Sequence, residues 1–144
     1  MLEVTQLNQC YGGSHILWDV NLSVPPSACT CLMGRNGMGE TTLLKCIMRL
    51  LPVASGELIH DGQQQQLAIG CALVFEPRLL ILDEPSEGIQ PNVVQEIGDI
   101  LLKLNREAGL TVLLVERKPR FARRVASEFR ILDKGRLVAE GGRG

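Results

Sequence analysis

The sequence predicts an α/β fold, in which a mainly parallel sheet is flanked by helices and an antiparallel β element precedes it. A glycine-rich stretch at residues 34–42 lies between an apolar strand-like run and a helical segment. Two runs, residues 79–82 and 110–115, are apolar throughout except for Thr111 and are typical of strands buried on both faces of a parallel sheet. Helical periodicity over residues 91–104 separates these runs, and such alternation of strand and helix favours a parallel sheet.

Length and composition favour a single domain. The chain has 144 residues with 45% hydrophobic content, which suffices for one core and is too short for two ordinary domains. The net charge of −1 and the pI near 6.1 give no overall attraction for nucleic acid. No run approaches the roughly eighteen apolar residues of a membrane span, and the start lacks the regions of a signal peptide. We therefore expect a cytoplasmic protein with no nucleic-acid partner.

The N-terminal segment predicts two antiparallel strands. Residues 2–7 alternate between apolar and polar side chains, and residues 17–24 do so loosely. Tyr11 stands on the glycine-flanked loop between them, where its ring could stack on an adenine or simply pack in the turn. A further strand is expected over residues 28–33.

The next stretch fits the phosphate-binding template G-x-x-x-x-G-K-[ST] at every defined position except the lysine. Glu40 stands where that lysine belongs. Glycine permits positive φ and close approach of the backbone, so successive N–H groups can converge on an anion at the start of the helix. The alternative is a glycine-rich turn that serves packing alone. The candidate nucleotide-binding residues in this loop are Gly34, Arg35, Asn36, Gly37, Met38, Gly39, Glu40, Thr41 and Thr42.

Glu40 decides how strongly such a loop could hold phosphate. A pair of unit charges about 4 Å apart is worth on the order of 4 kcal/mol at an effective dielectric constant of about 20, so a change from lysine to glutamate turns attraction into repulsion. Arg35 lies inside the loop and could offset this change by pointing at a phosphate. Without nucleotide, the Glu40 carboxylate could itself lie in the anion nest of the loop. Thr41 would offer its hydroxyl to a magnesium ion that bridges the outer phosphates.

The middle of the chain predicts a helix, a strand and a second helix. The helix from Thr41 should end near Pro52, because proline cannot continue a helix. A short strand over residues 57–60 runs into the turn Asp61-Gly62. Four glutamines then begin a helix, which we expect over residues 63–75.

Two carboxylates, Asp83 and Glu84, directly follow the buried strand at residues 79–82. They therefore belong at the carboxyl end of a strand, the edge where open α/β sheets bind ligands. Asp83 would hold Mg²⁺, directly or through water, and Glu84 would polarise the water that attacks a γ-phosphate. The alternative is a solvated acidic exit from the strand. The glycine-rich loop earlier in the chain favours the ligand-binding interpretation.

The remaining chain predicts a helix from Pro91 to near Gly109, a strand at residues 110–115, a helix at residues 119–126 and a closing hairpin at residues 129–139. The inner side of the first of these helices is expected to carry Val93, Val94, Ile97, Ile100, Leu101 and Leu104. One cluster of basic residues is either a solvated helix face or a patch for nucleic acid or lipid: Arg117, Lys118, Arg120, Arg123 and Arg124.

The cysteines are expected to be small buried thiols rather than metal ligands or disulfides. They are odd in number, none forms C-x-x-C, and only Cys10 lies outside apolar surroundings. Cys29 and Cys31 alternate on one face of a strand, which suits packing better than tetrahedral metal binding. His15 and His60 have no ligand-like neighbours in the sequence.

In their order along the chain, these motifs resemble those of the ATP-binding subunit of an ABC transporter. They are Tyr11-Gly12-Gly13, the glycine-rich loop, residues 63–73, the strand that ends in Asp83 and Glu84, and residues 87–91. The amino-acid sequences of residues 31–37, 63–70 and 84–91 resemble those of the ATP-binding subunits of urea and branched-chain amino-acid importers, and the urea importers are the closer match. The resemblance covers nearly the whole of residues 1–144 as one truncated nucleotide-binding domain, in two blocks, residues 1–62 and 63–144.

The resemblance implies a P-loop NTPase core, ATP and Mg²⁺ as ligands, and a role for each motif. Tyr11 would stack on adenine, residues 34–42 would be the Walker A loop, and Thr41 and Asp83 would hold the metal. Glu84 would be the catalytic glutamate. Residues 86–91 would meet a second ATP-binding subunit, in a homodimer or heterodimer that drives transmembrane permease subunits from the inner face of the cell membrane.

The chain departs from the pattern of this family at several places. Besides Glu40, the signature Leu-Ser-Gly-Gly-Gln survives only as Gly62-Gln63. Roughly eighty residues, which in the family form a helical subdomain and a glutamine-bearing loop, have no counterpart. Arg117 stands where relatives carry a histidine or, in this branch, a glutamine that faces the γ-phosphate, and Cys71 stands where an arginine is common.

Two classes of function follow. The chain is either an ATPase subunit of an importer, with Arg35 or the partner offsetting the lost lysine, or a non-hydrolysing remnant or interaction domain that keeps the fold. A small P-loop kinase is less favoured, because nothing resembles an acceptor site or a lid. Glu40 and the missing segment favour little or no hydrolysis.

Overall fold

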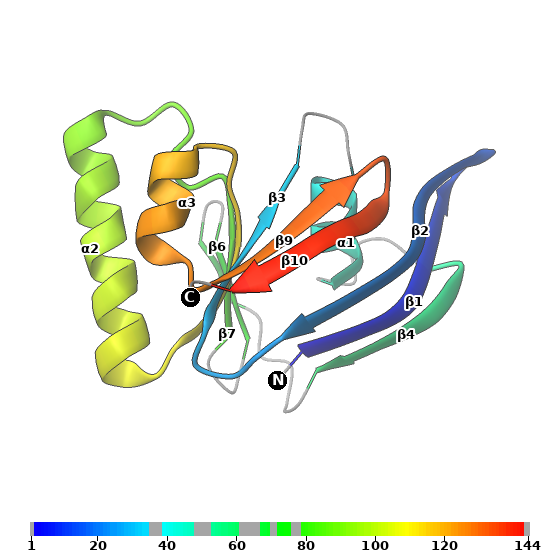
Figure 1. Ribbon diagram of the computed structural model, residues 1–144, viewed down its shortest axis with the longest axis horizontal. Helices are drawn as coiled ribbons and strands as arrows, with labels where there is room; N and C mark the ends of the chain where they lie inside the picture. The colour runs from blue at the N-terminus through cyan, green and yellow to red at the C-terminus, as the bar shows by residue number, and fades with distance from the viewer. Residues whose placement is uncertain are drawn as a thin grey trace.

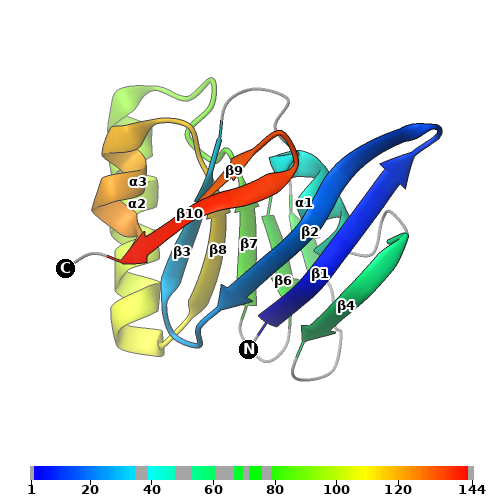
Figure 2. The same cartoon turned by 45° about the vertical axis from the view of Figure 1, so that its right-hand side comes forward.

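The computed structural model describes residues 2–34, 39–47, 53–60, 67–69, 72–75 and 79–142. Its core is a large sheet with two helices, α2 and α3, on one face, and with α1 and a small sheet on the other (Figures 1 and 2). The elements are β1 (Leu2–Tyr11), β2 (Ser14–Val24), β3 (Cys29–Met33), α1 (Glu40–Ile47), β4 (Ser55–His60), β5 (Leu67–Ile69), β6 (Ala72–Phe75), β7 (Leu79–Asp83), α2 (Pro91–Ala108), β8 (Thr111–Val115), α3 (Pro119–Val125), β9 (Glu128–Asp133) and β10 (Arg136–Gly142).

The small sheet confirms the predicted antiparallel β element. Its strand order is β2-β1-β4, and both pairings of the central strand β1 are antiparallel. Leu2 pairs with Val24 on one side and with His60 on the other. Alternating side chains of β2 are buried, as expected for a strand with one face on the core.

The large sheet has the order β10-β9-β3-β8-β7-β6-β5. Its centre is parallel, as predicted: β3 pairs in parallel with β8 and β9, and β7 pairs in parallel with β8. The sheet is therefore an α/β core of the expected kind, with antiparallel strands at both ends.

The helix predicted over residues 63–75 is wrong for the part of it that the structure describes. Residues 67–69 and 72–75 form strands β5 and β6, and β6 pairs antiparallel with β7. The edge of β7 that does not face β8 has backbone N–H and C=O groups that need hydrogen-bond partners. The hydrophobic pattern of residues 67–75 fits a helix or a strand equally well, so this segment forms strands and supplies those partners. Tertiary pairing here overrides the local pattern.

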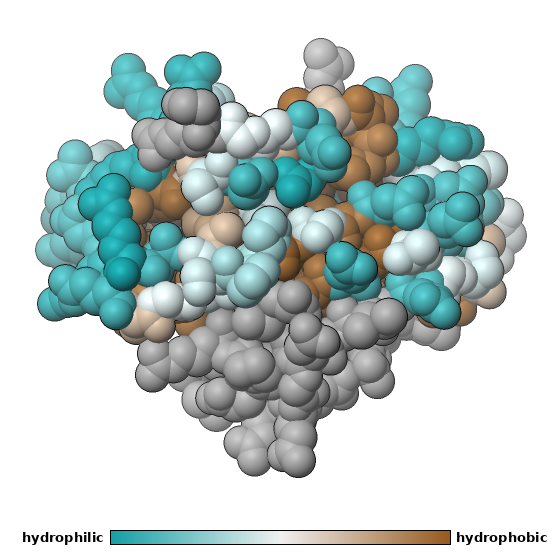
Figure 3. All heavy atoms as spheres, turned by 60° about the horizontal axis from the view of Figure 1, so that its bottom comes forward, coloured by the Kyte–Doolittle hydropathy of each residue, from teal (hydrophilic) through white to brown (hydrophobic). Residues whose placement is uncertain are grey.

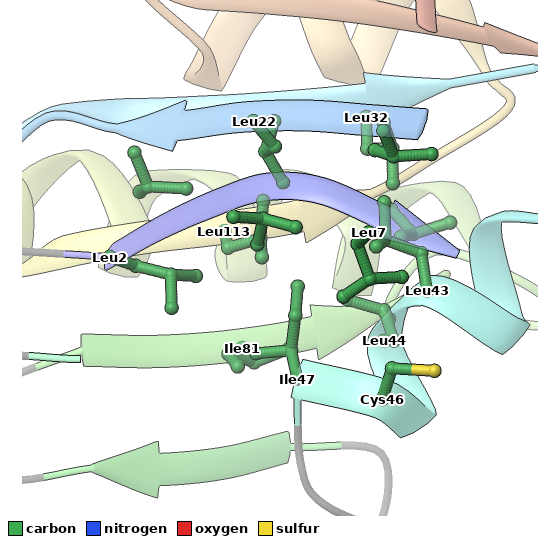
Figure 4. Close-up of a cluster of buried hydrophobic side chains, with 14 of the residues drawn as sticks. Leu2, Leu7, Leu22, Leu32, Leu43, Leu44, Cys46, Ile47, Ile81 and Leu113 are labelled. Carbon is green, nitrogen blue, oxygen red and sulfur yellow. The ribbon is translucent and has the colours of Figure 1, made fainter. Parts of the chain in front are cut away.

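Two hydrophobic cores lie on the two faces of the large sheet, and successive residues of a strand alternate between them. In β8, Leu113 and Val115 face the small sheet, whereas Val112 and Leu114 face the helices. Figure 4 shows the first core, in which Leu43 and Leu44 of α1 lie between the two sheets. Cys29 and Cys31 belong to the second core, as predicted for small buried thiols, and Cys10 is exposed.

Helix α2 begins at Pro91 and ends at Ala108, next to Gly109 as predicted, but it buries less than its sequence indicates. Gly109 has φ 67° and caps the helix, and its N–H donates to the carbonyl oxygen of Leu104. Of the predicted inner residues, Leu101 is buried, Val94 and Ile97 are half-buried, and three are exposed: Val93, Ile100 and Leu104. The helix contacts the sheet and α3 along a narrower face than the apolar stripe predicts. Apolar patches also lie among hydrophilic side chains on the face of the molecule seen in Figure 3.

The closing hairpin of β9 and β10 is attached to β2 through the turn at Gly135. The N–H of Trp18 donates to the carbonyl oxygen of Gly135 at 2.8 Å. Gly135 has φ +77°, and a β-carbon there would collide with the carbonyl oxygen of Ile16. This turn therefore requires glycine.

Substitution Gly135→Ala is expected to lower the free energy of unfolding by about 1–3 kcal/mol, because alanine is strained at positive φ and meets the Ile16 carbonyl. Urea denaturation measures the loss. Gly141→Ala is the matched control, since a β-carbon at Gly141 meets no atom within 4 Å. Equal stability of the two variants would contradict a close contact between this turn and β2.

Candidate nucleotide-binding site

Three neighbouring strands end at one edge of the large sheet, where two predicted site residues, Gly34 and Glu84, lie together with Glu116, which was not predicted. Gly34 follows β3, Glu84 follows β7 and Glu116 follows β8. The parallel register aligns these ends, because Val115 is the partner of both Leu32 and Asp83. The structure thus brings the start of the glycine-rich loop and the two carboxylates to a single edge, where open α/β sheets bind ligands.

The glycine-rich loop is described at its two ends, Gly34 and Gly39, while residues 35–38 lie outside the described residues. Gly39 has φ +105°, and its carbonyl oxygen accepts the first helical hydrogen bond, from the N–H of Leu43, at 2.8 Å. Thr41 is exposed in the first turn of α1, and Thr42 is half-buried. The loop therefore leads directly into the helix, as the phosphate-binding template requires.

Glu40 is buried, with only 4% of its surface exposed. Its carboxylate folds back over the first glycine of the loop, since a β-carbon at Gly34 would collide with Glu40 Oε1. The side chain at the lysine position is thus directed toward the loop rather than into solvent. A carboxylate in this place opposes a phosphate, and the expectation that it lies in the anion nest stays a prediction because the middle of the loop is not described.

Asp83 and Glu84 leave β7 through a tight backbone turn. Glu84 has φ 48°, and its N–H donates to the carbonyl oxygen of Val115 at 2.7 Å, which anchors the turn to β8. Burial raises the pKa of the Asp83 carboxyl above its ordinary value, although the nearby charges of Arg117 and Lys45 act in the opposite direction. Asp83 is therefore a partly buried acidic group near two cations, Arg117 and Lys45.

Arg117 forms an ion pair with Glu84, with 2.8 Å between Arg117 Nε and Glu84 Oε1. The two side chains are 41% and 24% exposed, so solvent weakens this attraction without removing it. Glu84 is the residue predicted to polarise water. In this arrangement its charge is balanced by the guanidinium group of Arg117.

A buried polar network centred on Glu116 was not predicted from the sequence. Glu116 is 1% exposed and accepts hydrogen bonds from the hydroxyl of Ser86 at 2.7 Å and from the N–H groups of Arg117 and Lys118. Lys118 Nζ in turn donates to the carbonyl oxygen of Ser86 at 3.0 Å. The network joins the loop after β7 to the loop after β8. Its signal in the sequence is a carboxylate directly after a buried strand, the same signal that singled out Asp83.

The other candidates lie apart from this edge or outside the description. The side chain of Tyr11 is outside the described part of the chain. His15 stacks on Trp18 with ring centroids 3.6 Å apart. Burial raises the pKa of Cys29 and of Cys31 to about 12, as expected for thiols that only pack. Within the described residues, no group of three or more histidine, cysteine, aspartate or glutamate side chains could hold a metal ion. Thr41 and Asp83, which were predicted to hold Mg²⁺, carry oxygen donors of the kind that this ion prefers, and their role as a pair stays a prediction.

The strand order and the parallel register define an α/β core of the P-loop NTPase type, and comparison with solved structures agrees. A nucleotide-free ATP-binding cassette from an ABC transporter has a TM-score of 0.86 at 15% identity, covering 100% of this chain and 92% of the other. The dimeric structure of MJ0796, a bacterial ABC transporter cassette, has a TM-score of 0.84 at 18% identity and full coverage of both chains. Both matches establish the fold.

Sequence comparisons agree with the fold. Residues 17–62 match the family model described as ABC transporter. A glutamine transport ATP-binding protein of Geobacillus stearothermophilus is 24% identical over 218 aligned positions, covering 97% of this chain and 90% of the relative. A high-affinity branched-chain amino acid transport ATP-binding protein of Pseudomonas aeruginosa is 48% identical over 80 residues, which cover 56% of this chain and 34% of the relative. The chain is thus similar to ATP-binding subunits of ABC transporters, in its first half to the family model and along most of its length to the glutamine transport relative. No helix among its described residues is long and apolar enough to cross a membrane.

Substitution Asp83→Asn tests the raised pKa of Asp83. Between about pH 3.8, the ordinary value, and the raised pKa, the unfolded chain releases a proton that the folded chain retains, so this carboxyl lowers stability as the pH rises through that window. The variant should therefore melt at a higher temperature than the parent at pH 7 and at the same temperature near pH 3. Glu87→Gln, at an exposed position of the same loop, is the control. If the parent melts at a higher temperature than Asp83→Asn at pH 7, the attraction of Arg117 and Lys45 for the Asp83 carboxylate outweighs the effect of its burial.

Proposed function

We propose that this chain is the ATP-binding subunit of an ABC-type importer for amino acids, with ATP binding as its main remaining chemistry. The observation that carries the proposal is the shared edge: the start of the glycine-rich loop, Asp83 and Glu84 follow the ends of strands held in parallel register. In this arrangement, residues 34–42 would bind the phosphates and Tyr11 would stack on adenine. Thr41 and Asp83 would hold Mg²⁺.

The class of transported substrate is inferred from the relatives. The similar proteins are described as transport ATP-binding proteins for glutamine, for branched-chain amino acids and for general L-amino acids. The sequence of residues 84–91 resembles that of urea and branched-chain amino-acid importer subunits, so we propose one of these two substrates. A permease made of transmembrane subunits and a second ATP-binding subunit, identical or different, would complete the transporter at the inner face of the cell membrane.

An internal deletion within a single nucleotide-binding domain, formed by blocks 1–62 and 63–144, accounts for the short chain. The alignment with the glutamine transport relative runs over 218 positions, so at least 74 of them (218 less 144) have no residue of this chain opposite. In the proposed domain the missing segment is peripheral to the sheet. The deleted segment would include most of the signature motif, which supports a subunit with little hydrolysis of its own.

The alternative function is a non-hydrolysing remnant or interaction domain that keeps the P-loop fold. Two observations favour it. The buried Glu40 carboxylate lies over Gly34, where it repels phosphate, and Arg117 is paired with Glu84, the proposed catalytic base. Binding and hydrolysis of ATP, measured separately, distinguish the two functions.

Titration calorimetry with Mg-ATP tests the binding half of the proposal. Glu40→Lys is expected to strengthen binding by at least about tenfold, because it replaces repulsion of the phosphates with attraction. Glu107→Lys makes the same change of charge at an exposed position near the far end of α2 and should leave the affinity unchanged. If Glu40→Lys also leaves it unchanged, the loop does not bind phosphate, and the interaction domain is favoured.

Phosphate release at saturating Mg-ATP tests the catalytic half. If the chain retains hydrolysis, Glu84→Gln should reduce the rate by about 100-fold or more, because the base that polarises the attacking water is lost. If the chain is a remnant, parent and variant release phosphate at the same background rate. Glu87→Gln, three residues away and exposed, controls for the loss of one charge from this loop.

A further inference from the structure

A groove is lined by residues of α2, of α3 and of the segment between β8 and α3. The two helices lie on the face of the large sheet opposite α1 (Figure 1). Its volume is about 750 Å³, within the range of roughly 300–1,000 Å³ that is usual for small-molecule sites. Apolar groups line it, namely Val94 from α2 together with Pro119 and Phe121 from α3. The alkyl stems of long basic side chains add to this apolar surface.

Four cations and no carboxylate are among the described residues that line this groove. The cations are Arg117, Lys118, Arg120 and Arg124. Two of them are balanced from outside the groove, Arg117 by Glu84 and Arg124 by Asp99. Among the residues described, the ammonium group of Lys118 donates to a neutral carbonyl oxygen and forms no ion pair, and the exposed Arg120 has no partner. The groove therefore keeps an excess of positive charge beside an apolar wall.

We propose that this groove binds a small organic anion with an apolar or aromatic body, such as an aryl or alkyl carboxylate. Charge complementarity requires a negative head group to meet Lys118 and Arg120, and the side chains of Val94, Pro119 and Phe121 provide a surface for the body. The site is separate from the nucleotide site and does not depend on the function proposed above. In this proposal, the basic cluster at residues 117–124 contributes to a binding site and is not simply a solvated helix face.

The groove is connected to the nucleotide site through Arg117. This one side chain lines the groove and also pairs with Glu84 at 2.8 Å. An anion in the groove therefore competes with Glu84 for the same guanidinium group. Lys118 makes a second connection, because it lines the groove and donates to the carbonyl oxygen of Ser86 in the loop after β7. Occupancy of the groove would weaken the hold of Arg117 on Glu84.

Titration calorimetry of the nucleotide-free chain with three probes tests the site. The probes are 1-naphthaleneacetate, 1-naphthylmethylammonium, which has the same ring system with the opposite charge, and acetate, which has the head group without the ring. Saturable binding of 1-naphthaleneacetate alone is expected. Equal binding of both naphthyl ions would overturn the proposal, because the groove would then be only apolar. Binding of acetate as tight as that of 1-naphthaleneacetate would overturn it too, because the head group alone would then account for the affinity.

Two arginine variants locate the site. Arg120→Ala should weaken binding of 1-naphthaleneacetate by roughly three- to tenfold, the effect of one partly solvated charge contact. Arg123→Ala is the matched control, since Arg123 is exposed on the same helix but does not line this groove. Thermal melts of both variants verify that they are folded. The same loss in both variants, or in neither, would overturn the assignment to the groove.

Glu84→Gln tests the connection. It removes the competitor for Arg117 without touching the groove, so it should tighten binding of 1-naphthaleneacetate by about two- to fivefold, as expected for an ion pair that is partly exposed. Glu87→Gln should not change the affinity. An unchanged affinity in Glu84→Gln would overturn the competition for Arg117.

Discussion

The parallel pairing of β3, β8 and β7 is the constraint on which the rest of the structure depends. Parallel strands run in the same direction, so their carboxyl ends, and the residues that follow them, meet at one edge. Val115 is in register with Leu32 on one side and with Asp83 on the other. This register gathers three loops that are far apart in the chain, after residues 33, 83 and 115. The helices and the small sheet bury the two faces of these strands and hold the edge in place.

Much of this arrangement could be predicted from the sequence, because most of the strands and helices carry strong local signals. Continuous apolar runs predicted β7 and β8, and Pro91 and Gly109 marked the ends of α2. The helix prediction for residues 63–75 failed in the part that the structure describes. The hydrophobic pattern there does not distinguish helix from strand, and pairing with the edge of β7 favours the strand. It also overestimated the buried face of α2, because an apolar stripe does not tell how much of it a neighbour covers.

The chemistry of the edge was only partly predictable. The sequence singles out Asp83, Glu84 and Glu40 by position. It does not tell that Arg117 reaches Glu84, nor that Glu116 joins the loop of Ser86 to the loop of Lys118, because these contacts depend on side-chain geometry between separate strands. The result is an unusual distribution of charge. The first residue of α1, Glu40, carries a buried carboxylate, and the cation Arg117 lies after β8.

The attachment of the last hairpin to the first sheet also governs the order in which the chain can fold. Trp18 donates to Gly135, and β9 pairs with β3, so the N-terminal third of the chain is completed by residues from its final fifth. A ribosome must therefore have delivered nearly the whole polypeptide before this part of the structure can close. Such long-range pairing slows folding and leaves apolar strands exposed during synthesis. Residues 2–33 are therefore made first but complete their packing last.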